Sequence, residues 1–217
     1  MVEIRIIVEG GGQAGASDII TANNTESLRQ SLNSFFTRLL CRNDVSISVG
    51  YGYRNAAKRF IEDSSYNSLF VDSDVSADKV HTWFEKLKTE NPDKPIIIPL
   101  ERQTDVFFMI QEMEAWFLKQ PECFEKWASH EGYEKRNTDL ISEHSLIRGK
   151  SVEYIHKPSE ITKILLKHFF EKKMPGSKRK LASYGKLKTA PVLLDCLDVH
   201  KLQECDAELS RFKGKFQ

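Results

Sequence analysis

Two groups of carboxylates follow short apolar runs in the first third of the sequence. Glu9 comes directly after the apolar run at residues 4–8, and Asp72 and Asp74 follow a second run in the segment SLFVDSD. In an extended segment, side chains two residues apart point to the same side. Two adjacent carboxylates repel each other unless one binds a proton or both bind a cation. Because oxygen ligands suit Mg²⁺ or Mn²⁺, the sequence predicts a metal site. Asp72 and Asp74 would hold the metal, and Glu9 would be the catalytic residue, as a ligand or as the general base.

The glycines after Glu9 permit a competing interpretation. Gly10, Gly12 and Gly15 fit G-x-G-x-x-G, the dinucleotide-binding fingerprint. That motif requires a helix that starts within the loop and an acid at the end of the second strand, about 20 residues further on. The helical pattern starts near Asn23, and the segment SLNSFFTRLL at the required distance contains no acid. A carboxylate at position 9 would also repel a pyrophosphate, so we favour the metal site.

Strand-like and helix-like segments alternate along the first half of the chain. Apolar runs predict strands at 4–8, 45–49, 68–72 and 95–100, and apolar stripes predict helices around 28–39, 54–63 and 77–90. The clearest helix is expected at 105–119, on a stripe of Val106, Ile110, Met113 and Phe117. Further on we expect a late strand at 151–155, a helix from Pro158 to about residue 170, a loop at 174–180 and helices in the last thirty residues.

This order of segments predicts an α/β fold with a mostly parallel sheet flanked by helices. We expect that core at residues 1–125 and a mainly helical C-terminal portion, packed on the core, at residues 126–217. A single domain containing both parts is the alternative. Because open α/β sheets place their sites at the carboxyl ends of strands, the strands that precede Glu9 and Asp72 should be neighbours.

Composition limits the environment and the partners of the chain. No apolar run approaches the roughly 20 residues that a membrane span needs, and no signal peptide is visible. The four cysteines are widely spaced, which is typical of a reduced compartment. The net charge is +1, but the segment 167–188 carries +7 and the rest of the chain −6. We therefore expect a cytoplasmic protein without membrane contacts, with a local surface for phosphate groups. Lys178, Arg179 and Lys180 would hold a nucleic-acid backbone, and a solvated loop is the alternative.

The pairing of strand–Glu–Gly with strand–Asp-x-Asp resembles the TOPRIM core of topoisomerases, primases and OLD-type nucleases. The segments FFMIQEMEAWFL and PSEITKILLKHFFEK, and the ending that begins YGKLKTAPVLL, resemble a family of small prokaryotic TOPRIM-like proteins of unassigned function. Its members are often encoded beside AAA- or ABC-type ATPases, in settings that suggest phage defence. The resemblance covers nearly the whole chain.

The resemblance implies a metal-dependent nuclease that cleaves DNA or RNA and acts as the effector of an anti-phage system with an ATPase partner. It also suggests additional site acids among Asp78, Glu112 and Glu114. We expect at least one of Glu112 and Glu114 to be a solvated acid on a helix. Tyr184 and Lys186 become further candidates for nucleic-acid contacts.

A second function belongs to another class: a catalytically degenerate TOPRIM-like subunit that binds or regulates an ATPase complex. The glycine-rich loop, in which the next acid is Asp18, motivates it, as does the lack of a third aspartate closer to Asp74 than Asp78. For either function, docking of the ATPase or of a second copy of the chain needs an apolar patch. We expect that patch in the C-terminal half, formed by Phe169, Phe170, Leu193, Leu194, Leu197 and Phe212.

Overall fold

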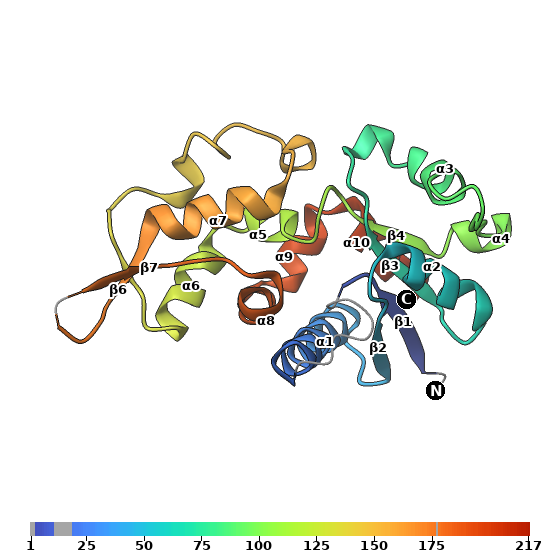
Figure 1. The fold of residues 1–217 in the computed structure, drawn as a ribbon, viewed down its shortest axis with the longest axis horizontal. Coiled ribbons are helices and arrows are strands. Elements are labelled where there is room, and N and C mark those ends of the chain that lie inside the picture. Colours follow the sequence, from blue (N-terminus) through green and yellow to red (C-terminus); the bar gives the residue numbers. More distant parts are fainter. Residues whose placement is uncertain (1–2, 11–18, 177) are drawn as a thin grey trace.

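Four parallel strands form the central sheet of the computed structural model, which describes residues 3–10, 19–176 and 178–217. The glycine-rich loop at 11–18, with Gly12, Gly15 and Asp18, lies outside the described residues. The strands β1 (Ile4–Val8), β2 (Val45–Val49), β3 (Ser68–Asp72) and β4 (Val106–Met109) lie in the order β2-β1-β3-β4 (Figure 1). Strand β1 pairs with both β2 and β3 in parallel. The predicted α/β fold with a parallel sheet, and the predicted pairing of the strands before Glu9 and Asp72, are confirmed.

Helices cover both faces of this sheet because its strands are apolar on both sides. On one face, Ile6, Val8 and Phe70 join a core with α1 (Ile19–Leu40) and α10 (Ala207–Lys215). On the other face, Ile7 and Val71 pack with α2 (Tyr53–Glu62) and α3 (Thr82–Thr89). A sheet that is buried on both faces needs near-continuous apolar strands, which is the pattern these segments show.

The helix predicted at 105–119 is wrong. The chain forms strand β4, a turn over residues 110–114 and the short helix α5 (Ala115–Lys119). Every residue of β4 is buried, and a short buried run of this kind has no period that distinguishes a strand from a helix. The prediction of a strand at 95–100 is also wrong. The chain is irregular from residue 95 up to α4 (Leu100–Gln103), because the prolines in this segment donate no hydrogen bond to a sheet. A 3₁₀ turn replaces the strand expected at 151–155.

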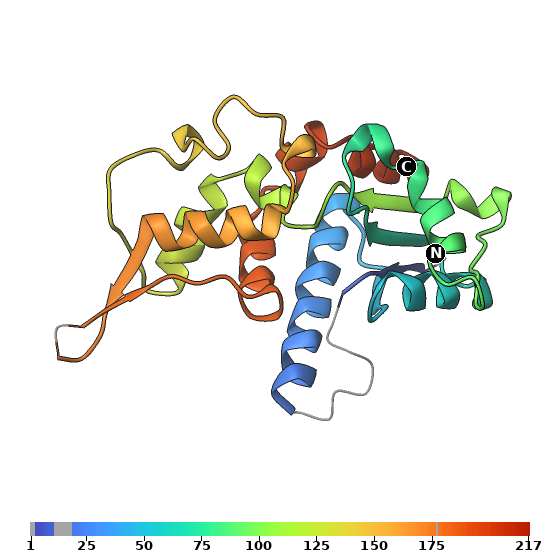
Figure 2. The ribbon, with the colours of Figure 1, turned by 45° about the horizontal axis from the view of Figure 1, so that its top comes forward.

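The C-terminal part is mainly helical, as predicted. It contains α6 (Glu122–His130), α7 (Pro158–Phe169), α8 (Lys186–Cys196) and α9 (Val199–Glu204), beside the sheet (Figures 1 and 2). A small antiparallel sheet lies at its outer end, with β5 (Glu134–Lys135), β6 (Phe170–Lys173) and β7 (Arg179–Leu181) in that order. The segment expected as a loop at 174–180 therefore ends in strand β7, and the β6–β7 hairpin projects away from the parallel sheet (Figure 2).

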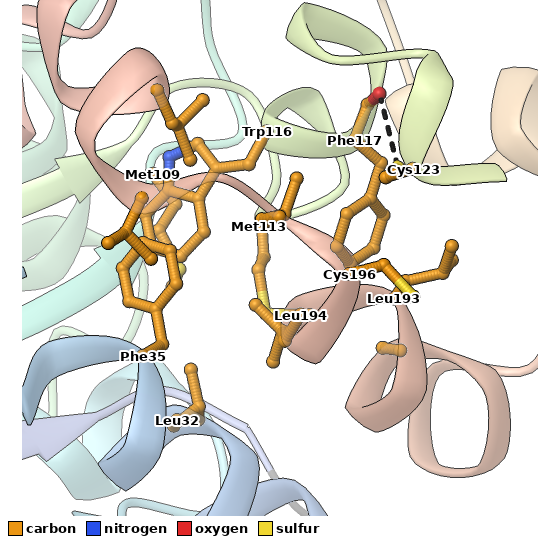
Figure 3. Close-up of a cluster of buried hydrophobic side chains, with 14 of the residues drawn as sticks. Leu32, Phe35, Met109, Met113, Trp116, Phe117, Cys123, Leu193, Leu194 and Cys196 are labelled. Atoms are coloured by element: carbon orange, nitrogen blue, oxygen red, sulfur yellow. Dashed lines mark hydrogen bonds between the residues drawn. The ribbon is translucent and has the colours of Figure 1, made fainter. Parts of the chain in front are cut away.

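One continuous core includes residues of both parts of the chain. Phe35 of α1 stacks on Trp116 of α5, with ring centroids 4.9 Å apart, and Leu194 of α8 belongs to the same core (Figure 3). After α9 the chain returns to the sheet, where Phe212 of α10 packs edge-on against Phe107, with centroids 5.1 Å apart. The two parts thus hold each other in place through buried aromatic contacts.

The predicted docking patch is also wrong, because the same core buries all of its residues. All of its members lie in the monomer's core and expose at most 2% of their surface: Phe169, Phe170, Leu193, Leu194, Leu197 and Phe212. These six side chains are therefore not available to a partner. Within the described residues, no helix is both long enough and apolar enough to cross a membrane.

Candidate functional site

The carboxylates predicted from the sequence lie at the point where the order of the strands reverses. From β1 the chain first builds β2 on one side and later β3 on the other. Such a switch point leaves a crevice beyond the carboxyl ends of the two strands, and ligands of open α/β sheets bind there. Glu9 follows β1 and Asp72 ends β3, so both lie at the switch point.

Glu9 is held directly against the neighbouring strand. Its Oε2 accepts a hydrogen bond from the backbone N–H of Asp72 at 3.1 Å, and its own N–H donates to the carbonyl of Phe70 at 2.7 Å. Burial, followed by the nearby charge of Asp72, raises the pKa of Glu9 from 4.5 to about 8. Without a bound cation, Glu9 therefore holds a proton at neutral pH.

Asp72 is buried and accepts two hydrogen bonds. Its Oδ1 accepts from the backbone N–H of Met113 at 2.8 Å, and its Oδ2 accepts from the ammonium of Lys186 at 2.7 Å. Burial raises the pKa of Asp72 although the Lys186 charge opposes that effect. Burial alone would lower the pKa of Lys186, but the charges of Asp72 and Glu114 outweigh it and raise that pKa. The two groups lie at ion-pair distance in the structure.

Glu114 is the third carboxylate of the site and is completely buried. The hydroxyl of Tyr184 donates to its Oε1 at 2.5 Å. Its Oε2 lies 3.8 Å from the Lys186 ammonium, too far for a hydrogen bond, and has no hydrogen-bond partner among the described residues. Burial, with the charge of Asp72 adding to it, raises the pKa of Glu114. Burial and Glu114 together raise the pKa of Tyr184 well above its usual range.

The loops after β3 and β4 are fastened to each other, which fixes the positions of Asp72 and Glu114. Gln111 adopts a positive φ of 64°. Its N–H donates to Ser73 Oγ at 2.8 Å and its carbonyl accepts from the N–H of Asp74 at 2.9 Å. Glu112 Oε2 accepts from the N–H of Ser159 at 2.7 Å in the first turn of α7. Glu112 therefore holds α7 in place, and the expectation of a solvated helix acid at 112 or 114 is wrong.

The other predicted acids have partners outside this group of carboxylates. Asp74 has a left-handed backbone, with a φ of 56°, which breaks the extended geometry that would place it beside Asp72. Its Oδ2 instead pairs with Lys86 at 3.0 Å, where about half of its side chain is exposed. Asp78 is exposed in a 3₁₀ turn and accepts a hydrogen bond from Ser76.

The basic residues divide into two groups. Lys178, Arg179 and Lys180 are exposed on the hairpin, and Arg179 pairs with Glu171 at 2.5 Å. The segment that follows β7 runs inward and delivers Tyr184 and Lys186 to the carboxylates. The basic hairpin is thus joined to the site by a few residues of chain. Spacing along the sequence gave no indication that Lys186 pairs with Asp72, 114 residues earlier.

The site presents oxygen donors of the kind that Mg²⁺ and Mn²⁺ bind. Across the described ranges, however, no three His, Cys, Asp or Glu side chains are already grouped so that they could hold a metal ion. The ammonium of Lys186 lies where a cation would balance Asp72 and Glu114. Comparisons of the chain with family models, with curated proteins and with solved structures find no match.

Proposed function

We propose that this protein is a nuclease that hydrolyses nucleic-acid phosphodiesters with the help of a divalent cation. The observation that supports this most is the set of contacts that links three carboxylates at this edge of the sheet: half-buried Glu9 accepts from the N–H of Asp72, and the buried Asp72 and Glu114 both pair with Lys186. Keeping several carboxylates out of water is unfavourable unless a cation or a proton neutralises them. Groups with strongly shifted pKa values in a crevice are typical of functional sites.

The donor atoms fit a hard divalent cation. All of them are carboxylate oxygens, and Glu114 Oε2 is buried without a hydrogen-bond partner in the described part of the chain. Asp72 and Glu114 would hold the ion. Asp74 would join them on turning away from Lys86, because an exposed ion pair of this kind contributes little. The bound ion would stabilise charge on a phosphate oxygen and lower the pKa of a bound water.

The protein's own groups supply the remaining roles. A general base must be ionised and works best when its pKa lies near the operating pH, and a bound divalent cation would lower the pKa of Glu9 from about 8. Glu9 would therefore take the proton from the attacking water. Lys186, and the exposed hairpin lysines Lys178 and Lys180, would bind the phosphates of the substrate strand.

The competing proposal is a regulatory subunit without catalysis. It is favoured by the lysines that already pair with the aspartates, Lys186 with Asp72 and Lys86 with Asp74. The same resemblance that motivates a nuclease supports, by itself, a role in phage defence beside an AAA- or ABC-type ATPase. The ATPase is therefore part of the test.

One assay distinguishes the nuclease from the regulatory subunit. The purified chain is incubated with plasmid DNA and with total cellular RNA, in Mg²⁺, in Mn²⁺ and in EDTA, with and without the neighbouring ATPase. The nuclease predicts cleavage that requires the metal. Intact DNA and RNA in every metal condition, with the ATPase present, would support the regulatory subunit instead.

A further inference from the structure

We infer that Lys186 is the resident cation of the carboxylate site, and that a divalent cation binds there only by displacing its ammonium group. This inference rests on the proposed function, because it concerns how the same site takes up its metal. Lys186 Nζ lies 2.7 Å from Asp72 Oδ2 and 3.8 Å from Glu114 Oε2. Among the described residues, no other lysine or arginine forms an ion pair with either carboxylate.

The ammonium and a metal ion would compete for the same oxygens. Mg²⁺ binds carboxylate oxygens at about 2.0–2.1 Å, so an ion between Asp72 Oδ2 and Glu114 Oε2 would lie within a few ångströms of Nζ. Like charges at that separation repel strongly in a buried site. The ion would also bond Glu114 Oε2, which the lysine leaves without a hydrogen bond. The exchange therefore gives this oxygen a partner that it lacks.

Lys186 is able to leave without dismantling the site. It is the first residue of α8, and 40% of its side chain is exposed. Asp72 keeps its hydrogen bond from the backbone N–H of Met113, and Glu114 keeps the one from Tyr184. The carboxylates therefore stay in position while the long lysine side chain turns toward solvent or toward a substrate phosphate.

The exchange is testable on the unmodified protein by amine labelling. The chain is treated with acetic anhydride with and without millimolar Mn²⁺, and labelled peptides are quantified by mass spectrometry. Lys201 of α9, which is exposed and has no ion pair within the described residues, is the internal control. Labelling of Lys186 should rise several-fold with Mn²⁺ while that of Lys201 stays constant. Unchanged or reduced labelling of Lys186 at saturating Mn²⁺ would overturn the exchange.

A variant tests the same competition from the other side. Mn²⁺ affinity is measured by electron paramagnetic resonance for the wild type, Lys186→Met and the control Lys201→Met. Removing a competing charge this close should tighten Mn²⁺ binding about tenfold or more in Lys186→Met, and leave Lys201→Met unchanged. Equal affinity of Lys186→Met and the wild type would reject the exchange but not the proposed function. Absence of Mn²⁺ binding in both would reject the two together. If Lys186→Met does not fold, the labelling result decides.

Discussion

The backbone N–H of Asp72 donates a hydrogen bond to the carboxylate of Glu9 at 3.1 Å. This contact joins the ends of β1 and β3 across the switch point, so the parallel sheet itself sets the separation of the two acids. The site is therefore built on strand ends, with Glu114 added from the turn after β4 and Lys186 from the start of α8.

Stability without metal should fall as the pH rises. The pKa of Glu9 is about 8 in the folded chain and 4.5 ordinarily. Between these values the folded protein binds a proton that the unfolded chain has released, so the free energy of unfolding decreases with pH. Urea unfolding in EDTA at about pH 5.5 and about pH 8.5 should show a loss at least about 2 kcal/mol larger for the wild type than for Glu9→Gln. Equal losses would contradict the assignment of this proton to Glu9.

Tyr184→Phe should destabilise the fold. It removes the only hydrogen bond to the completely buried Glu114 carboxylate that the described residues provide. Leaving a buried acceptor unsatisfied costs about 1–3 kcal/mol, measurable by urea unfolding. Tyr154→Phe is the matched control, because the Tyr154 side chain is largely exposed, and it should change stability by less than about 0.5 kcal/mol. Similar effects of both variants would refute the role of Tyr184.

Two lysine variants should differ sharply in stability. Lys119 is only 8% exposed and pairs at 3.0 Å with both Glu153 and Asp206, the latter 2% exposed. Lys119→Met leaves a buried charge unpaired, which costs about 3–5 kcal/mol. Lys58→Met breaks an exposed pair with Glu62 and should cost less than about 1 kcal/mol. The comparison is made by urea unfolding at neutral pH, and a cost for Lys119→Met as small as that for Lys58→Met would be inconsistent with this account.

The hairpin should set the salt dependence of nucleic-acid binding. Lys178→Ala combined with Lys180→Ala removes two exposed positive charges. If each contacts one phosphate of duplex DNA, the slope of log affinity against log salt should decrease by about 2. The measurement is fluorescence anisotropy with labelled DNA over a salt series. The pair Lys58→Ala with Lys88→Ala, on helices α2 and α3, is the control. An unchanged slope in the hairpin variant would exclude these phosphate contacts.

Sequence patterns were sufficient for the central sheet where the strands are short apolar runs that end in polar residues. Residues 4–8, 45–49 and 68–72 were each placed correctly, and their order along the chain indicated a parallel sheet. The fourth strand was missed because Val106, Ile110, Met113 and Phe117 repeat at helical spacing although they belong to a strand, a turn and a helix. Tertiary pairing with β3 decides the structure of that segment.

In the site, too, local sequence patterns predict some features, while contacts between distant residues determine the others. The location of Glu9 and Asp72 follows from strand ends, which are local features. The separation of Asp74 from Asp72 depends on a left-handed backbone at Asp74 that no spacing rule anticipates. The pairing of Lys186 with Asp72 depends on how α8 packs against α1 and α6, since 114 residues separate the two in sequence. Glu114 and Lys186 were suggested by resemblance, and their contacts by the structure.

The central claim is tested most directly by metal-dependent cleavage in two site variants and a matched control. Wild type, Glu9→Gln, Asp72→Asn and Glu62→Gln, an exposed acid on α2, are assayed on DNA and RNA with Mn²⁺, with and without an added AAA- or ABC-type ATPase, the proposed partner. Circular dichroism confirms the fold of each variant. We predict cleavage by the wild type and Glu62→Gln, and a loss of about 10²-fold or more in both site variants. Cleavage at wild-type rates by folded Glu9→Gln and Asp72→Asn would contradict the account.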